Sequence, residues 1–161
     1  METPHRIWQA PAAVAARRSR PLAIWRLAAD LRPRLNAMLP VKRSVAVVIT
    51  KGNETLSIRR PENDDELPGI WGLPAGTARA SETPQDIITR IGFDKLGVRL
   101  QPVSILSTGT QERARYRLEM ELWEARMEGS PTCPEWRWAP LDLLRPGAAA
   151  GSLCCELALR D

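Results

Sequence analysis

The sequence of 161 residues predicts an α+β domain that follows a basic, partly helical extension. The domain is indicated from Ser44 onward by short apolar runs that alternate with turn residues and by one well-capped helix pattern between them. The extension is indicated by charge, because residues 1–43 carry a net charge of +7 while the rest of the chain carries −3. We therefore predict an extension over residues 1–43 and one domain over residues 44–161.

The extension is rich in Ala, Arg and Pro, and residues 21–31 have the pattern of a helix, with Pro21 near its first position and Leu27 and Leu31 four residues apart. Three interpretations stay open: a helix packed on the domain, a flexible basic arm, or a cleaved organelle-targeting peptide. Clustered cations attract phosphate backbones without regard to sequence. Contact with nucleic acid through residues 1–43 is therefore one expectation.

The domain is expected to begin with two strands joined as a hairpin. Ser44–Thr50 and Thr55–Arg60 are apolar runs rich in strand-forming residues, and the four residues Lys51–Glu54 between them are typical of a turn. The next segment, Pro61–Pro68, is acidic and bounded by prolines, which indicates a surface loop.

A helix of about thirteen residues is predicted after this loop region. Thr83 is a suitable N-cap, Pro84 suits the first helical position, and Asp86 can reach back as in a capping box. Gly97 is expected to end the helix. The apolar face of this helix comprises Ile87, Ile88, Ile91 and Leu96.

The remaining elements follow from shorter patterns. Leu100–Ser107 is a strand candidate, and Tyr116–Met127 alternates apolar and polar residues as a half-buried strand does. Trp136–Ala139 predicts a short strand and Pro140–Leu144 a helical turn. Ser152–Arg160 predicts a last helix, capped by Ser152.

Composition excludes several functional classes. No apolar run approaches the roughly 20 residues that cross a bilayer, so no membrane association is expected. The three cysteines, Cys133, Cys154 and Cys155, have the spacing of neither a disulfide framework nor a zinc site, which favours a cytoplasmic location. The single histidine, His5, lies in the extension, so a Ser-His or Cys-His nucleophilic site has no base in the domain.

The segment that follows the acidic loop carries a spaced motif: Gly76, then Glu82 six residues later, Arg90 eight residues after that, and a closing Gly97-Val98 pair. In this register it resembles the signature of the Nudix hydrolase family, which reads Gly, five residues, Glu, seven residues, Arg-Glu-aliphatic-any-Glu-Glu-any-Gly-aliphatic.

Two flanking segments extend the resemblance, which covers roughly residues 42–160. Leu67–Gly76 is similar to the family's frequent lead-in, and Trp136–Leu141 is similar to its late passage from strand to helix. The resemblance implies a mixed β-sheet between helices, an α/β/α sandwich.

The motif departs from the family at the residues that hold metal. Ile91, Asp94 and Lys95 stand where the signature has its three Glu residues after the Arg, and Gly92 replaces an aliphatic residue. Family members use these carboxylates to bind magnesium, which bridges the diphosphate of a nucleoside diphosphate derivative and activates water. Three carboxylates at i, i+3 and i+4 would share one helical face, and Mg²⁺ requires hard oxygen ligands. The depleted set implies weak binding of Mg²⁺ or Mn²⁺, or none.

The resemblance assigns a role to each motif residue. It implies Glu82, Arg90 and Asp94 as catalytic residues, and Asp94, Glu82 and Glu112 as metal ligands. The candidate substrate contacts are Gly76 of the motif together with Lys95 and Trp71, which are chosen for their side-chain chemistry. The Lys95 ammonium could meet a phosphate directly, and the Trp71 ring could stack on a base. The alternative is that Lys95 points to solvent and Arg90 pairs with Asp86.

Two functions remain open at this point. One is a weak, metal-dependent hydrolase that cleaves the diphosphate of a nucleoside diphosphate derivative. The other is a non-catalytic Nudix-fold module that binds nucleotide, RNA or a protein partner. A variant of these is a cleft that handles a related phosphorylated small molecule through Lys95 and Arg90 without metal. The sequence does not determine the substrate. It does not determine the oligomeric state either, and a dimer is one of the open possibilities.

Overall fold

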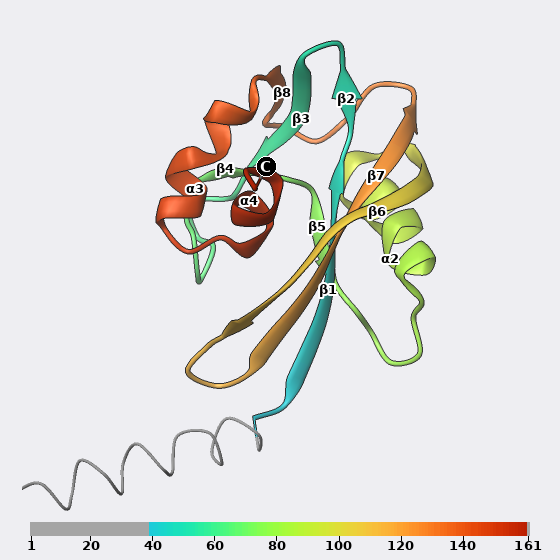
Figure 1. Ribbon diagram of the computed structural model, residues 1–161. Helices are drawn as coiled ribbons and strands as arrows, with labels where there is room; N and C mark the ends of the chain where they lie inside the picture. Colours follow the sequence, from blue (N-terminus) through green and yellow to red (C-terminus); the bar gives the residue numbers. More distant parts are fainter. Residues whose placement is uncertain (1–38, 161) are drawn as a thin grey trace, which may run out of the picture. The chain divides into compact units, whose positions relative to one another are not determined.

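A mixed four-stranded sheet forms the centre of the domain in the computed structural model, which describes residues 39–160 (Figure 1). Its strands are β1 (Val41–Val48), β5 (Ala75–Thr77), β6 (Arg99–Glu112) and β7 (Arg117–Glu128), in the order β5-β1-β7-β6. Strand β1 runs parallel to β7, while β5 and β6 are antiparallel to their neighbours. The parallel pair β1–β7 is therefore buried in the middle of the sheet.

Most of the predicted extension lies outside the described residues, so the interpretations of residues 1–38 stay predictions. The first strand begins at Val41 and not at Ser44, because Val41, Lys42 and Arg43 continue the parallel pairing with β7. The charged side chains of Lys42 and Arg43 separate Val41 from the apolar run, which is why the sequence pattern begins three residues late.

A second, smaller sheet is built around β3 (Glu54–Arg59), which pairs with β2 (Thr50–Lys51), β4 (Trp71–Gly72) and β8 (Trp136–Ala139). The predicted turn is confirmed, since β2 and β3 pair across a tight turn in which Gly52 has a φ of +60°, a conformation that glycine adopts without steric cost. The predicted pairing of Ser44–Thr50 with Thr55–Arg60 is wrong beyond Thr50, because Ser44–Val48 belongs to β1 and pairs with β5 and β7 in the central sheet.

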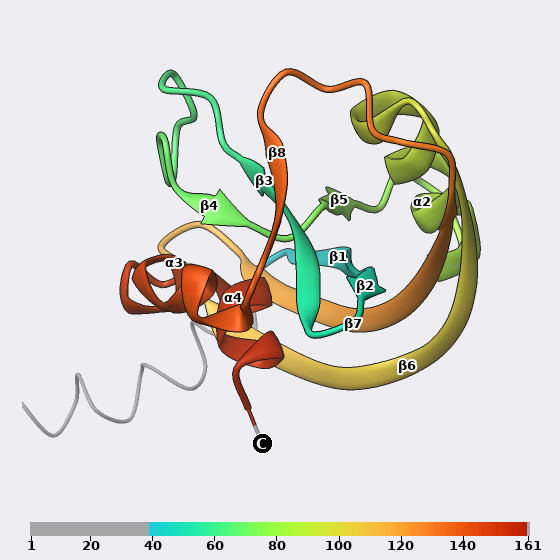
Figure 2. The same ribbon diagram turned by 90° about the horizontal axis from the view of Figure 1, so that it is seen from above.

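Helices lie on both faces of the central sheet (Figures 1 and 2). On one side are α2 (Pro84–Arg90) and a π-helix (Ile91–Leu96), and on the other are a 3₁₀ turn (Leu141–Leu144), α3 (Arg145–Ala149) and α4 (Leu153–Ala158). None of the helices in residues 39–160 is long and apolar enough to cross a membrane.

The side chains of β1 divide the core into two clusters. Val45 and Val47 point to one face, where they pack with Ile87 and Ile88 of α2. Ala46 and Val48 point to the other face, toward α4, which contributes four residues to that cluster: Leu153, Cys154, Cys155 and Leu157. Burial on both faces explains the unbroken apolar run of β1. The predicted α+β fold, an α/β/α sandwich, is confirmed.

The predicted start of α2 is also confirmed. The Thr83 side chain accepts a hydrogen bond from the Asp86 backbone, and the Asp86 carboxylate accepts one from the Thr83 backbone at 2.9 Å. At α4 the outcome differs: Ser152 occupies the N-cap position, but its hydroxyl makes no capping bond and lies 3.2 Å from Cys154 Sγ.

The predicted thirteen-residue helix changes its winding halfway. After Arg90 the chain forms a π-helix, and the Gly97 N–H donates to the Gly92 carbonyl, five residues back. The same carbonyl accepts from the Val98 N–H at 3.0 Å. A Cβ at position 92 would lie 2.7 Å from the Val98 carbonyl oxygen, so the bare backbone of Gly92 packs directly against the start of β6.

Strand β6 is longer than predicted, since it extends from Arg99 to Glu112 and not from Leu100 to Ser107. It forms an edge of the sheet, most of its side chains are exposed, and its register with β7 shifts twice. These features disturb the alternation of apolar and polar residues on which the sequence prediction relied.

Candidate anion-binding cleft

The principal candidate site is an open cleft of about 840 Å³. The central sheet, the acidic loop of residues 61–68 and the start of α4 all contribute to its walls. Three carboxylates and five cations line it, and the carboxylates belong to Asp64, Glu66 and Glu135. The cations are Lys42, Arg59, Arg60, Lys95 and Arg113. An excess of cations in a partly enclosed site favours an anionic ligand.

Beside this cleft, Arg90 fixes the loop that precedes α2. Its Nε and Nη2 atoms donate to the two carboxylate oxygens of Glu82 at 2.7 and 2.8 Å, and Nη2 also donates to the Thr77 carbonyl at 2.8 Å. The Arg79 backbone N–H donates to Glu82 at 2.7 Å. The alternative pairing of Arg90 with Asp86 is wrong, because Asp86 serves the capping box.

These contacts decide the electrostatics of Glu82. The hydrogen bonds from Arg90, followed by the one from the Arg79 backbone, lower the pKa of Glu82 to about 2. The same ion pair raises the pKa of Arg90. Glu82 is therefore ionised, but both of its oxygens already accept strong hydrogen bonds. A carboxylate held in this way is a weak base, and its oxygens are less available to coordinate a metal ion.

Glu82→Gln is expected to lower stability most at neutral pH and less in acid. The folded pKa of about 2 lies below the ordinary value of 4.5, so the contribution of Glu82 is fully present above pH 4.5 and is lost as the pH falls toward 2. Urea unfolding at several pH values should show the gap between wild type and variant closing across this window. A gap that stays constant from pH 7 to 2.5 would contradict the ion pair, and Glu54→Gln, at an exposed position of β3, is the control.

Two of the predicted substrate-binding residues, Gly76 and Lys95, do line the cleft. A Cβ on Gly76 would lie 3.1 Å from Ile91 Cγ1, so this glycine lets the loop approach the helix closely. Lys95 is exposed to solvent at the cleft, but desolvation by the surrounding atoms, followed by the charges of Arg60 and Arg90, lowers its pKa. In residues 39–160 no carboxylate lies within ion-pair distance of Lys95.

The structure does not bring the other predicted residues into the cleft. Asp94 is exposed outside it, with its carboxylate 3.9 Å from Arg79 Nη2. Glu112 lies exposed at the end of the edge strand β6. Trp71 precedes the cleft residue Gly72, and the Arg137 guanidinium stacks 3.9 Å above its ring, which leaves less of the ring for a base.

The donors present do not fit a divalent metal ion. Among the described residues, no three His, Cys, Asp or Glu side chains gather as a metal-binding group would require. Glu82 is bonded through both oxygens, Asp94 lies outside the cleft, and Lys95 lines it with a cationic side chain. A neighbouring cavity of about 330 Å³ is lined by Glu82, Glu119 and Glu121, but Glu119 accepts from Arg117 and Glu121 from the Trp123 indole.

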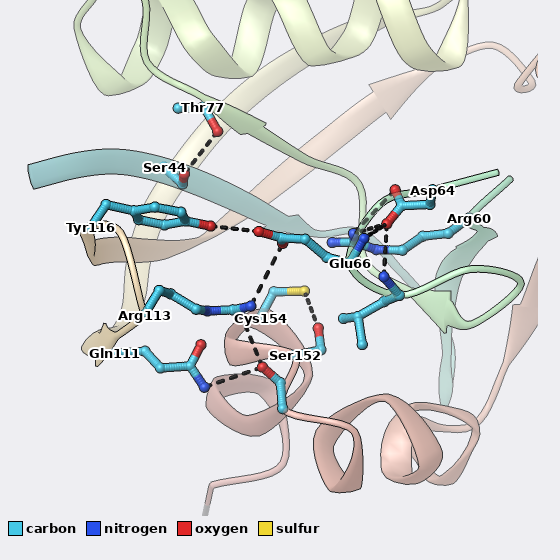
Figure 3. A network of polar contacts seen from close by, with 12 residues as sticks. Ser44, Arg60, Asp64, Glu66, Thr77, Gln111, Arg113, Tyr116, Ser152 and Cys154 are labelled. Atoms are coloured by element: carbon cyan, nitrogen blue, oxygen red, sulfur yellow. Dashed lines mark hydrogen bonds and ion pairs between the residues drawn. The ribbon is translucent and has the colours of Figure 1, made fainter.

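The other half of the cleft holds a network of polar contacts that the sequence does not predict (Figure 3). Arg60 pairs with Asp64 at 3.1 Å, and Glu66 accepts a hydrogen bond of 2.5 Å from the Tyr116 hydroxyl. Arg113 Nη1 lies 3.7 Å from Glu66. These residues come from the acidic loop and from the two sides of the β6–β7 turn, so no local sequence pattern joins them.

Comparisons with known proteins agree with this fold and motif. Residues 40–153 match the NUDIX domain family model. Among solved structures, the E. coli ORF135 protein is similar with a TM-score of 0.64 and 17% identity over 76% of this chain and 91% of that chain. The MutT protein from Methanosarcina mazei Go1 gives a TM-score of 0.60 and 21% identity over 68% of this chain and 83% of that chain.

A NUDIX hydrolase from Nitrosomonas europaea gives a TM-score of 0.62 and 15% identity over 74% of this chain and 86% of that chain. At these identities the structures report on the fold alone, and no curated protein sequence matches the chain. The family model covers well over half of the residues, and the loop–helix motif lies within the matched segment. The chain therefore belongs to the Nudix hydrolase family.

Proposed function

We propose that the cleft binds a phosphorylated small molecule, a nucleoside diphosphate derivative or a related compound, through side-chain cations in place of a divalent metal ion. The observation that carries this proposal is the position of Lys95. Lys95 stands where the family signature has a metal-binding Glu, and it lines a cleft that four other cations share. A cation at that point supplies the positive charge that a metal ion supplies in the family.

The charges near Lys95 support binding of an anion. Desolvation lowers the pKa of Lys95, and repulsion from Arg60 and Arg90 lowers it further, which supports a local excess of positive charge. A phosphate group would relieve this repulsion and would meet a point charge from Lys95 and a planar fork of donors from Arg60. Arg60 is already held by Asp64, which fixes its orientation.

The cleft is also suited to a small molecule in size and in surface. Its volume of about 840 Å³ lies within the range of roughly 300–1,000 Å³ that is usual for ligand sites. Buried aliphatic side chains line it between the charged groups, namely Leu67, Leu73, Leu118, Met120 and Leu153. The ligand is therefore expected to combine an anionic group with an apolar portion.

Hydrolysis of the diphosphate is the second candidate function. It is favoured by family membership and by the retained arrangement of Gly76, Glu82 and Arg90 at the loop and helix. The engaged oxygens of Glu82 and the exposed position of Asp94 argue for turnover well below that of family members with the complete motif. Contact with nucleic acid through residues 1–43 stays a prediction.

Binding without metal is the test of the proposal. Nucleoside diphosphates and their derivatives, titrated calorimetrically into the protein, are expected to bind with the same affinity in EDTA as in Mg²⁺ or Mn²⁺. The same mixtures, sampled over hours, report release of phosphate-containing products. Affinity that appears only with metal, together with metal-dependent product release, would reject the proposal and establish the hydrolase.

A further inference from the structure

Glu66 reaches across the cleft from the acidic loop to the β6–β7 turn (Figure 3). One of its oxygens accepts a 2.5 Å hydrogen bond from the Tyr116 hydroxyl, and the other lies 3.7 Å from Arg113 Nη1. These partners are about fifty residues away in the sequence. The carboxylate of Glu66 thus occupies the point toward which the donors of the turn are directed.

The donors at this point are held in place without Glu66. Arg113 Nη2 donates to the Gly151 carbonyl at 3.2 Å, which fixes the guanidinium against the start of α4. The Lys42 ammonium lies 4.0 Å above the Tyr116 ring. The hydrogen bond to Glu66 raises the pKa of Tyr116, so the phenol remains a neutral donor.

This group offers more donors than Glu66 uses. Arg113 Nε is buried and has no hydrogen-bond partner among the described residues. Lys42 forms no ion pair with the described carboxylates. A phosphate has more acceptor oxygens than a carboxylate and more charge, so it would satisfy these cations better than Glu66 does.

The acidic loop does not depend on Glu66 for its shape. Asp64 accepts from the Glu66 and Leu67 backbone N–H groups at 3.0 and 2.8 Å and pairs with Arg60. The Gly69 N–H closes the loop on the Pro61 carbonyl at 3.2 Å. The side chain of Glu66, which is 44% exposed, can therefore leave its partners without unfolding the loop.

We propose that Arg113, Tyr116 and Lys42 form a second anion-binding subsite of the cleft, which the Glu66 carboxylate fills until an anionic group of the ligand displaces it. This inference rests on the proposed function, which places a first phosphate at Lys95. The ligand class follows: a molecule that carries at least two anionic groups, with a phosphate at Lys95 and a second phosphate or carboxylate at Arg113. Glu66 then favours ligands with two such groups, since a single anion at Lys95 leaves the carboxylate undisturbed.

The test is a titration of inorganic pyrophosphate in EDTA, followed by NMR at the Arg113 side-chain Nε–H signal. Glu66→Gln keeps the size of the side chain and removes the competing charge, so affinity at this signal is expected to rise about three- to tenfold. Asp65→Asn, in the same loop and outside the cleft, makes the same change in net charge and is expected to have no effect.

A second pair of variants locates the gain. Glu66→Gln combined with Tyr116→Phe is expected to lose most of the increase, because the phenol is one of the freed donors. Equal increases for Glu66→Gln and Asp65→Asn would overturn the inference, as would an increase that Tyr116→Phe leaves intact. If pyrophosphate shifts signals near Lys95 alone in every variant, the second subsite fails and the proposed function stands. If no variant or wild type binds pyrophosphate or nucleoside diphosphates, both fail.

Discussion

Gly92→Ala is expected to destabilise the domain by about 2–3 kcal/mol, the cost of overpacking at a site that cannot move aside. The added Cβ would lie 2.7 Å from the Val98 carbonyl oxygen and 3.1 Å from the Leu100 backbone N. Both contacts are backbone atoms of the chain that enters β6. The better helix propensity of Ala, about 1 kcal/mol, offsets only part of the clash.

Thermal unfolding gives the measurement. For a domain of this size the loss corresponds to a fall in Tm of roughly 10 °C. Gly72→Ala is the matched control, because a Cβ there would meet only Cys155 Sγ at an ordinary 3.7 Å. Equal melting temperatures for Gly92→Ala and wild type would show that the π-helix can move away from β6, contrary to the packing described above.

The helix around Gly92 shows how far local sequence determines structure. Thr83, Pro84 and Asp86 fix its start, and Gly97 fixes its end in a left-handed conformation, so both boundaries are predictable. The π winding between them is not, because it follows from the close packing of Gly92 on β6, a contact with another element. The sequence shows only that a glycine is unfavourable in an ordinary helix at this position.

The candidate site, like the helix, is predictable from local sequence only in part. Of the motif residues, Lys95 and Gly76 line the cleft, and Glu82 and Arg90 lie next to each other across eight residues. It does not predict that both oxygens of Glu82 are taken by Arg90 and the Arg79 backbone. Side-chain partners of this kind depend on loop geometry, which spacing alone does not give.

Long-range contacts account for the rest of the cleft. Glu66, Arg113 and Tyr116 meet only because the β6–β7 turn folds back toward the acidic loop. In the sequence, the acidic run from Pro61 to Pro68 has the composition of any solvated loop. Its charges gain a role once the structure places them against an excess of cations.

Lys95 is the one cation at the three signature Glu positions, and under the proposed function its replacement has a direct consequence for binding. Lys95→Glu is expected to weaken binding of a nucleoside diphosphate in EDTA by about tenfold to a hundredfold, which is the range for losing one charge-assisted contact. The new carboxylate would also repel the ligand's phosphates within the cleft. Affinity for Mn²⁺ is expected to rise only slightly, because Asp94 stays outside the cleft and Glu82 stays bonded to Arg90.

Calorimetric titration of three variants separates the local charge from the net charge. Lys95→Met removes the cation without adding an anion. Its affinity for the nucleoside diphosphate should therefore lie between the affinities of wild type and Lys95→Glu. Lys51→Glu makes the same change in net charge on β2, away from the cleft, and is expected to bind nearly as wild type does. If Lys51→Glu weakens binding as much as Lys95→Glu, the attraction comes from the overall charge of the protein. Lys95 would then have no special part in holding a phosphate, and it would not supply the positive charge that a metal ion supplies in the family.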